Sequence, residues 1–200
     1  IAGPGGVRQH RPAVLGGHAR GFGDRVVIVA LDTDHPRAEA GDGLDAAAVA
    51  LAKGSVAGTA VCVAGSMSTM RPVVRGGDRN AQVMIGEAAA RELFRRKADG
   101  LRRAGCDLLM MEMMRDTDHA AWASEAALST GLPVWIGISA ERGKPGQLQG
   151  WGRDDCRLED IVRALAALRP AVMMIMHTSV NDTDEALGVL RKHWGGPIAV

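Results

Sequence analysis

Six short apolar segments recur along the chain at regular spacing, and this feature restricts the possible folds more than any other. Their residues are apolar almost continuously instead of at every second position, which predicts strands that are buried on both faces. Strands of this kind form parallel sheets that are covered by helices. The chain is therefore predicted to be an α/β protein with six parallel strands. The predicted strands lie at residues 26–31, 59–64, 107–112, 134–139, 171–176 and 198–200.

Five helices are expected between these strands. Asp116 or Thr117 can cap the third helix and Asp182 or Thr183 the fifth, because short polar side chains accept hydrogen bonds from free backbone N–H groups. Repeated strand and helix units build either a closed barrel or an open, doubly wound sheet. Both folds place functional groups at the carboxyl ends of the strands. The predicted helices lie at residues 44–53, 85–104, 116–129, 158–168 and 182–194.

Residues 25–200 are expected to form one domain, which follows an irregular N-terminal segment at residues 1–24 that is rich in Gly, Arg, His and Pro. The chain begins with Ile1 instead of Met and stops at Val200 inside an apolar run. We therefore expect both ends to be truncated.

The charge balance argues against nucleic acid and membranes as partners. The 200 residues contain 24 Lys and Arg and 23 Asp and Glu, which leaves a net charge of only +1. The Arg-rich segment 91–103 alternates with apolar residues, as the solvent-facing side of a helix does. No apolar run approaches the roughly 20 residues of a membrane helix, and no signal-like apolar stretch begins the chain. Three separate cysteines, Cys62, Cys106 and Cys156, fit a reducing compartment, so a cytoplasmic location is expected.

Polar residues follow five of the predicted strands. Because parallel strands end at the same edge of a sheet, these residues are expected to converge on one candidate site, although many strands end in polar loops. Asp32, Asp34 and His35 could bind a metal ion there, but Pro36 favours a simple turn. The strand-end residues are Asp32, Thr33, Asp34 and His35; Ser66 and Ser68; Glu112; Ser139 and Glu141; and His177, Thr178 and Ser179.

Glu112 and His177 are the two most informative strand-end residues. A carboxylate that ends an apolar strand is costly to bury without a partner. Glu112 could accept a ligand amine or act as a general base, or it could cap the next helix or pair with a neighbouring strand. His177 could bind a metal or exchange protons, or it could be a structural hydrogen-bonding residue. The methionines before both residues are interpreted as core filling.

Four segments, in order along residues 44–200, resemble the homocysteine S-methyltransferase family. The segment 101–114, LRRAGCDLLMMEMM, resembles the signature L-x-x-A-G-[VC]-D-x-[IL]-x-x-E-T. Glu125 and Ala126 stand where the family has an E-A pair in the next helix. The other three segments are VAGS at 63–66, LPVWIGIS at 132–139 and GPIAV at 196–200.

This resemblance implies a (β/α)8 TIM-type barrel, of which the chain would contain about the second to seventh strands. It implies transfer of a methyl group to the thiol of homocysteine, which yields methionine, from a donor such as S-adenosylmethionine or S-methylmethionine. The partners would be these small molecules. Zinc would hold the thiol as a nucleophilic thiolate. Glu112 matches the family glutamate that receives the substrate amino group, and Ser66 and Ser139 are further candidates for substrate binding.

The chain departs from the family at the expected zinc ligand. The family strand that ends G-[IV]-N-C corresponds to one that ends with Met176 and His177, so His177 is the candidate metal ligand in place of the cysteine. The adjacent cysteine pair of the family belongs to a strand outside the chain. The family T-N-T after the second strand is replaced by Asp32, Thr33 and Asp34. A zinc-free barrel enzyme with different chemistry and an inactive barrel fragment remain the alternatives.

Overall fold

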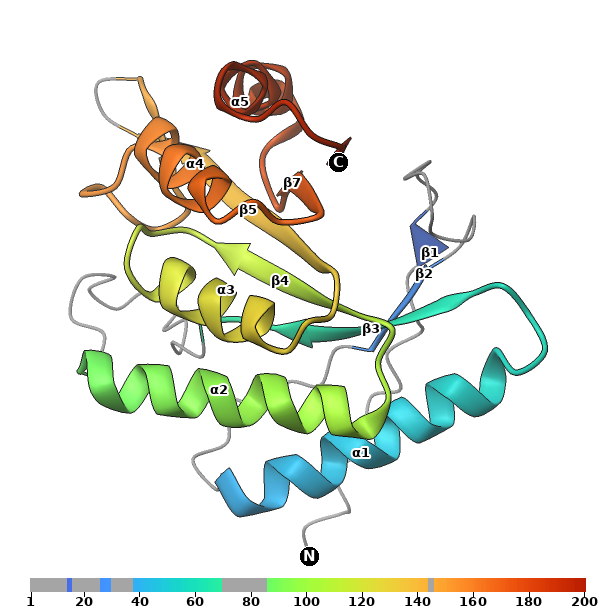
Figure 1. Ribbon diagram of the computed structural model, residues 1–200. Coiled ribbons are helices and arrows are strands. Elements are labelled where there is room, and N and C mark those ends of the chain that lie inside the picture. The colour runs from blue at the N-terminus through green and yellow to red at the C-terminus, as the bar shows by residue number, and fades with distance from the viewer. Residues whose placement is uncertain (1–13, 16–25, 30–37, 70–85, 144–145) are drawn as a thin grey trace, which may run out of the picture.

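The computed structural model describes residues 14–15, 26–29, 38–69, 86–143 and 146–200. Strands and helices alternate along almost all of this part of the chain (Figure 1). The elements are β1 (Val14–Leu15), β2 (Val26–Val29), α1 (Ala38–Ser55), β3 (Cys62–Met67), α2 (Glu87–Ala104), β4 (Leu108–Met114), α3 (His119–Ser129), β5 (Val134–Arg142), β6 (Leu148–Gly150), α4 (Leu158–Ala167), β7 (Val172–Met176), α5 (Val180–His193) and β8 (Ile198–Ala199).

The strands form one sheet whose spatial order is β1-β2-β3-β4-β5-β7-β8. The predicted parallel strands are confirmed, since β2, β3, β4, β5, β7 and β8 pair in parallel and in chain order. Five helices separate these strands in the described residues, as the sequence indicates. Each helix carries the chain back to the amino ends of the strands. The carboxyl ends of all six strands therefore lie together, at what we call the strand-end edge of the sheet.

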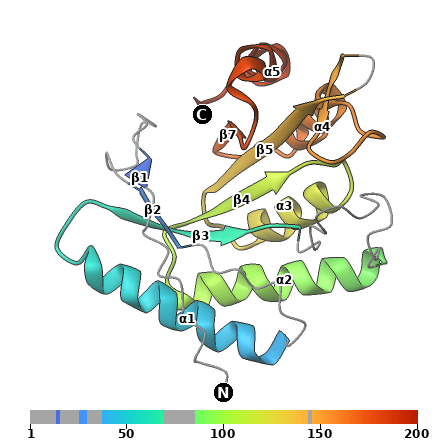
Figure 2. The same ribbon diagram turned by 180° about the vertical axis from the view of Figure 1, so that it is seen from behind.

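The helices pack on the outside of a curved sheet (Figures 1 and 2). One apolar cluster lies between the sheet and these helices and includes Leu109, Ile136, Ile175 and Phe94. A second, smaller cluster lies on the inner face of the sheet and is built from alternate strand residues. Its buried members are Ala64, Leu108, Met110, Trp135, Val172 and Met174.

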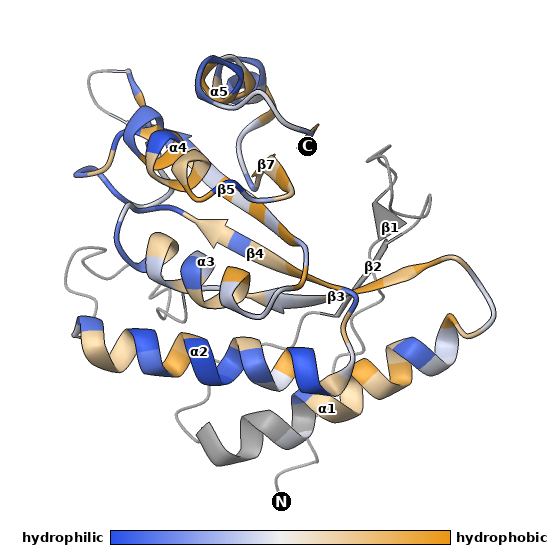
Figure 3. Ribbon diagram, viewed as in Figure 1, coloured by the Kyte–Doolittle hydropathy of each residue, from blue (hydrophilic) through white to orange (hydrophobic). Residues whose placement is uncertain are grey.

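The helix α2 confirms that the Arg-rich segment is a solvent-facing helix surface. Phe94 and Leu101 on its inner side are buried, whereas Arg95 and Arg102 are exposed. Hydrophilic residues line the outer side of α2, and the strands behind it are mostly hydrophobic (Figure 3). No helix in the described part of the chain is long and apolar enough to cross a membrane.

The segment between α2 and β4 shows why the motif AGCD occurs there. Gly105 has φ 96°, a left-handed conformation that closes α2 and that other residues rarely adopt. Asp107 accepts a hydrogen bond from the backbone N–H of Val63 at 2.7 Å and forms an ion pair with Lys53 at 2.6 Å. This carboxylate therefore joins β4 to β3 and α1 at the amino end of the sheet, opposite the candidate site.

Several element boundaries differ from the predictions. The strand β3 is three residues later than predicted at both ends, so Gly65 and Ser66 lie inside it. The helix α5 begins at Val180, and Ser179 takes the N-cap position predicted for Asp182 or Thr183. The third helix, α3, begins at His119 with Asp118 at its N-cap position, so the cap predicted at Asp116 or Thr117 was wrong. Asp116 still contributes to this end of the helix, because its Oδ1 accepts a hydrogen bond from the N–H of Ala120 at 3.0 Å. The short antiparallel strands β1 and β6 were not predicted.

Candidate active site

Four adjacent strands bring Ser66, Glu112, Ser139 and His177 to the same edge of the sheet. Ser66 pairs with Met110 on β4, two residues before Glu112. Ser139 pairs with Met176, which directly precedes His177. Ser66, Glu112 and Ser139 alternate in step with the inner apolar cluster, so they belong to its face. The predicted residues Asp32, Thr33, Asp34 and His35 lie outside the described residues.

Glu112 stands beside an irregularity in β4. The register between β4 and β5 shifts between Met111 and Met114, and Met113 has φ 56°. This left-handed residue turns the end of the strand directly after Glu112. The carboxylate is half-buried, and within the described residues it has no hydrogen bond or ion pair. The two structural roles considered for Glu112, a helix cap and a bridge to a neighbouring strand, are therefore not observed there.

Ser139 is the more enclosed of the two serines. Its side chain is fully buried, and its Oγ has no hydrogen-bond partner in the described residues. A buried hydroxyl without a partner costs about 1–3 kcal/mol, so an unpaired Oγ on an inner strand face is a group that a bound ligand can satisfy. Ser66 is half-buried on β3.

His177 is exposed at the tip of β7 and has φ 50°, which is also left-handed. No group of three or more His, Cys, Asp or Glu side chains that could hold a metal ion exists among the described residues. Cys62 begins β3 and Cys106 precedes β4, so both lie at the amino end of the sheet, away from His177. The described residues around His177 therefore do not by themselves form a zinc site.

Cys106 and Cys156 lack the lowered pKa of a reactive thiol. Burial raises the pKa of Cys106 from 9.0 to about 11. Burial also raises the pKa of Cys156, whose Sγ accepts a hydrogen bond from Arg153. All three cysteines of the chain are free.

Met176 makes a contact at this edge that the sequence interpretation missed. Its side chain crosses the bare backbone of Gly137 on β5 and reaches β4, where Sδ accepts a hydrogen bond from the N–H of Met113 at 3.4 Å. Thr178 completes the link, because its Oγ1 donates to the carbonyl of Met176 and accepts from the N–H of Ala140, both at 3.1 Å. The tips of β4, β5 and β7 are therefore connected through one methionine and one threonine.

A second missed feature is the β5–β6 hairpin, which packs against the end of β4. The backbone of Gly150 lies against the carbonyl of Arg115 so closely that a Cβ would overlap it. Arg153 forms an ion pair with the buried carboxylate of Asp116 at 3.1 Å and holds Asp155 at 2.7 Å. The Arg153 guanidinium lowers the pKa of Asp155. The polar pair Arg115 and Asp116 directly after β4 was the available signal for this cluster.

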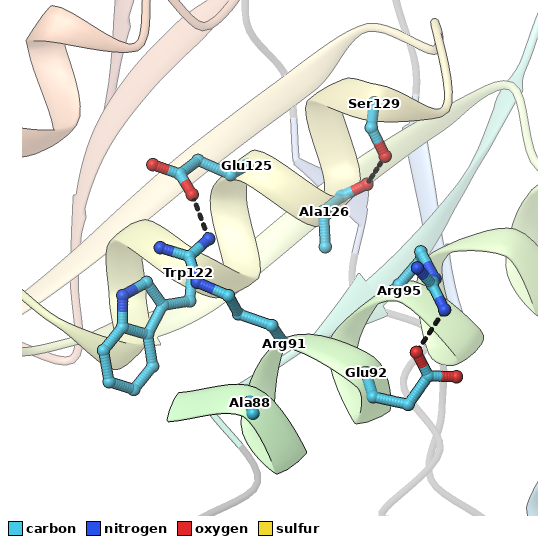
Figure 4. A pocket seen from close by; sticks show the side chains of 8 residues that line it. All are labelled: Ala88, Arg91, Glu92, Arg95, Trp122, Glu125, Ala126 and Ser129. Atoms are coloured by element: carbon cyan, nitrogen blue, oxygen red, sulfur yellow. Dashed lines mark hydrogen bonds and ion pairs between the residues drawn. The ribbon is translucent and has the colours of Figure 1, made fainter. Parts of the chain in front are cut away.

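The outer helices form a separate groove of about 390 Å³ between α2 and α3 (Figure 4). Arg91 lies across it, bonded to Glu87 and Glu125 and with its guanidinium carbon 5.5 Å from the Trp122 ring centre. These partners raise the pKa of Arg91. None of the predicted site residues lines this groove.

Comparison with solved structures finds proteins of similar fold. Three crystal structures of the homocysteine methyltransferase MmuM from Escherichia coli, in apo, metallated and oxidized forms, match with TM-scores of 0.63, 0.62 and 0.58 and identities of 22%, 21% and 21%. The matches cover 89%, 89% and 88% of this chain and 65%, 66% and 64% of the MmuM chains, so the chain spans about two thirds of their length. Comparison with curated proteins found no match.

The structural likeness confirms the predicted fold, a (β/α)8 barrel of which this chain contains a part. The family model described as Homocysteine S-methyltransferase matches residues 28–198, which is most of the sequence and includes β3, β4, β5 and β7. The chain therefore belongs to the homocysteine S-methyltransferase family.

Proposed function

We propose that the strand-end edge of this chain binds homocysteine and belongs to an enzyme that methylates its thiol to give methionine. The observation that carries the proposal is Glu112, a half-buried carboxylate without a protein partner in the described residues, within the motif that the family shares. A carboxylate in this position forms a charge-assisted hydrogen bond with an ammonium group more strongly than an exposed one does.

Glu112, Ser139 and Ser66 would each contact a different part of the substrate. Glu112 receives the amino group of the substrate and thereby sets its orientation. The hydroxyl of Ser139, which is buried and unpaired, offers a hydrogen bond from the inner face, and Ser66 offers another from β3. The apolar layer of Trp135 and Met174 beneath them excludes water from the methylene groups.

Zinc is the metal that the family resemblance implies. His177 would contribute a neutral imidazole ligand, and the two further ligands would be the cysteine pair that the family carries outside this chain. The described residues contain no group of three donors that could hold the ion without those cysteines. The proposed methyl donor is a sulfonium compound such as S-methylmethionine or S-adenosylmethionine. A cytoplasmic location agrees with three free cysteines.

The amine role of Glu112 is tested by Glu112→Gln in the complete protein. Removing the charge should weaken homocysteine binding by about 10- to 100-fold, because a hydrogen bond to a charged group contributes about 1.5–3 kcal/mol. Calorimetry with 4-mercaptobutyrate, which is homocysteine without its amino group, should show no difference between the two proteins. Glu92→Gln, at an exposed glutamate on α2, is the matched control. Equal homocysteine affinity of wild type and Glu112→Gln would contradict the assignment.

A further inference from the structure

The end of β7 reaches across two neighbouring strands through one side chain. Met176 belongs to the inner face of β7, and on β5 the residue beneath it is Gly137. A Cβ at Gly137 would lie 2.7 Å from Sδ of Met176 and closer still to its methyl group. The missing side chain at Gly137 therefore gives the methionine its path to β4.

The group that Met176 meets on β4 is the peptide that joins Glu112 to Met113. Because Met113 is left-handed and the β4–β5 register shifts here, the N–H of Met113 has left the regular ladder between these strands. The thioether sulfur is a weak acceptor, but it is soft and flexible enough to reach this N–H, at 3.4 Å. The contact lies on the peptide bond next to the Glu112 carboxylate.

The other end of Met176 carries His177. The backbone turns left-handed at His177, and Thr178 closes this turn through its hydrogen bonds to Met176 and Ala140. Left-handed conformations of residues other than glycine persist only where the surroundings hold them. Among the described residues at this edge, Met113 and His177 are the non-glycine residues with left-handed backbone, and the contact between Met113 and Met176 joins them.

We propose that Met176 is a positioning residue whose thioether, held against the Met113 N–H, fixes the Glu112 carboxylate relative to His177 and so sets the amine-binding geometry of the site. This inference rests on the proposed function. Without the sulfur contact, the peptide after Glu112 would lose its partner, and the carboxylate would no longer be held where the substrate ammonium arrives.

The test compares three variants of the complete protein. Met176→Leu keeps most of the volume and removes the acceptor, whereas Met176→Gln keeps an acceptor of similar reach. Met173→Leu is the matched control, because Met173 is a fully buried methionine of the same strand on its opposite face. The readouts are the KM values for homocysteine and for 4-mercaptobutyrate, together with the amide proton resonance of Met113.

Met176→Leu should raise the KM for homocysteine about tenfold, because a misplaced Glu112 carboxylate would lose roughly the free energy of one hydrogen bond to the ammonium group. The KM for 4-mercaptobutyrate should stay unchanged. Met176→Gln should restore most of the homocysteine KM, and Met173→Leu should match wild type. The Met113 resonance should move in Met176→Leu. A wild-type homocysteine KM in Met176→Leu, or equal losses for both thiols, would overturn the positioning role. A wild-type protein that methylates no thiol would instead refute the proposed function.

Discussion

Gly137 and Met176 share one space on the inner face of the barrel: the glycine leaves it free and the methionine fills it from the neighbouring strand. Neither residue is informative alone, since glycines and methionines are common in cores. Together they determine how this space is filled, so the packing can be tested by changing each residue.

Gly137→Ala should destabilise the protein by about 1–3 kcal/mol, because the added Cβ overlaps the end of Met176 inside a packed layer. Denaturant unfolding measures this loss. Combining Gly137→Ala with Met176→Ala should remove the overlap, so the double variant should lose less stability than the sum of the two single variants. Additive losses would show that the two side chains do not compete for the space.

Lys97 and Asp45 form an ion pair that is buried between α2 and α1, with 8% and 4% of their side chains exposed. Removing one partner leaves the other charge buried without compensation, so Lys97→Met should cost about 3–5 kcal/mol. The double replacement Lys97→Met with Asp45→Leu should recover most of this loss. Thermal unfolding of the three proteins checks the prediction, and a single variant as stable as wild type would contradict it.

The buried thiol of Cys106 should make stability depend on pH in the alkaline range. Its pKa is raised from 9.0 to about 11, so the folded state keeps the proton to higher pH than the unfolded state does. The stabilisation is complete below about pH 9 and is lost as the pH rises toward 11. The loss is at most about 3 kcal/mol, since each pKa unit corresponds to roughly 1.4 kcal/mol.

Unfolding curves of wild type and Cys106→Ala between these pH values measure the effect. The variant should lack this part of the pH dependence. A wild-type thiol that reacts with an alkylating reagent at pH 8 as fast as an unfolded control would contradict the buried, protonated state of Cys106.

His177→Ala should reduce the bound zinc of the complete protein, because the imidazole is the metal donor proposed at the tip of β7. Elemental analysis of the purified protein gives the stoichiometry directly. His193→Ala is a suitable control, since His193 lies at the end of α5 and pairs with Glu159. Full zinc content in His177→Ala would refute the ligand assignment, because residues other than His177 would then hold the metal.

The alternation of strands and helices could be predicted because buried parallel strands are apolar throughout and helices such as α2 and α4 have a clear polar face. The edge residues Ser66, Glu112, Ser139 and His177 could be placed together for the same reason, since strand ends in such a sheet share one edge. The predicted end of β3 was too early because Gly65 and Ser66 resemble a turn in sequence, although their backbone continues the ladder with β4.

The contacts within the site could not be predicted in this way. The left-handed conformation of Met113 accompanies the register shift of β4 against β5, and no residue type in this segment predicts such a shift. Met176 resembles the other core methionines in the sequence, and its hydrogen bond depends on an empty position at Gly137, which lies 39 residues earlier in the chain (176 minus 137). The β5–β6 hairpin was not predicted, because its glycines obscure a strand of only three residues.

The left-handed backbone at Met113 and His177 has a consequence for engineering the protein. Glycine adopts this conformation without strain, so Met113→Gly and His177→Gly are changes that a search for thermostable variants would favour. Both would release the constraint at the very edge that carries Glu112. Selection for heat resistance alone is therefore expected to lower substrate affinity through changes at these two positions. A stabilised variant should keep both side chains, and its stabilising substitutions should be placed in the outer helices.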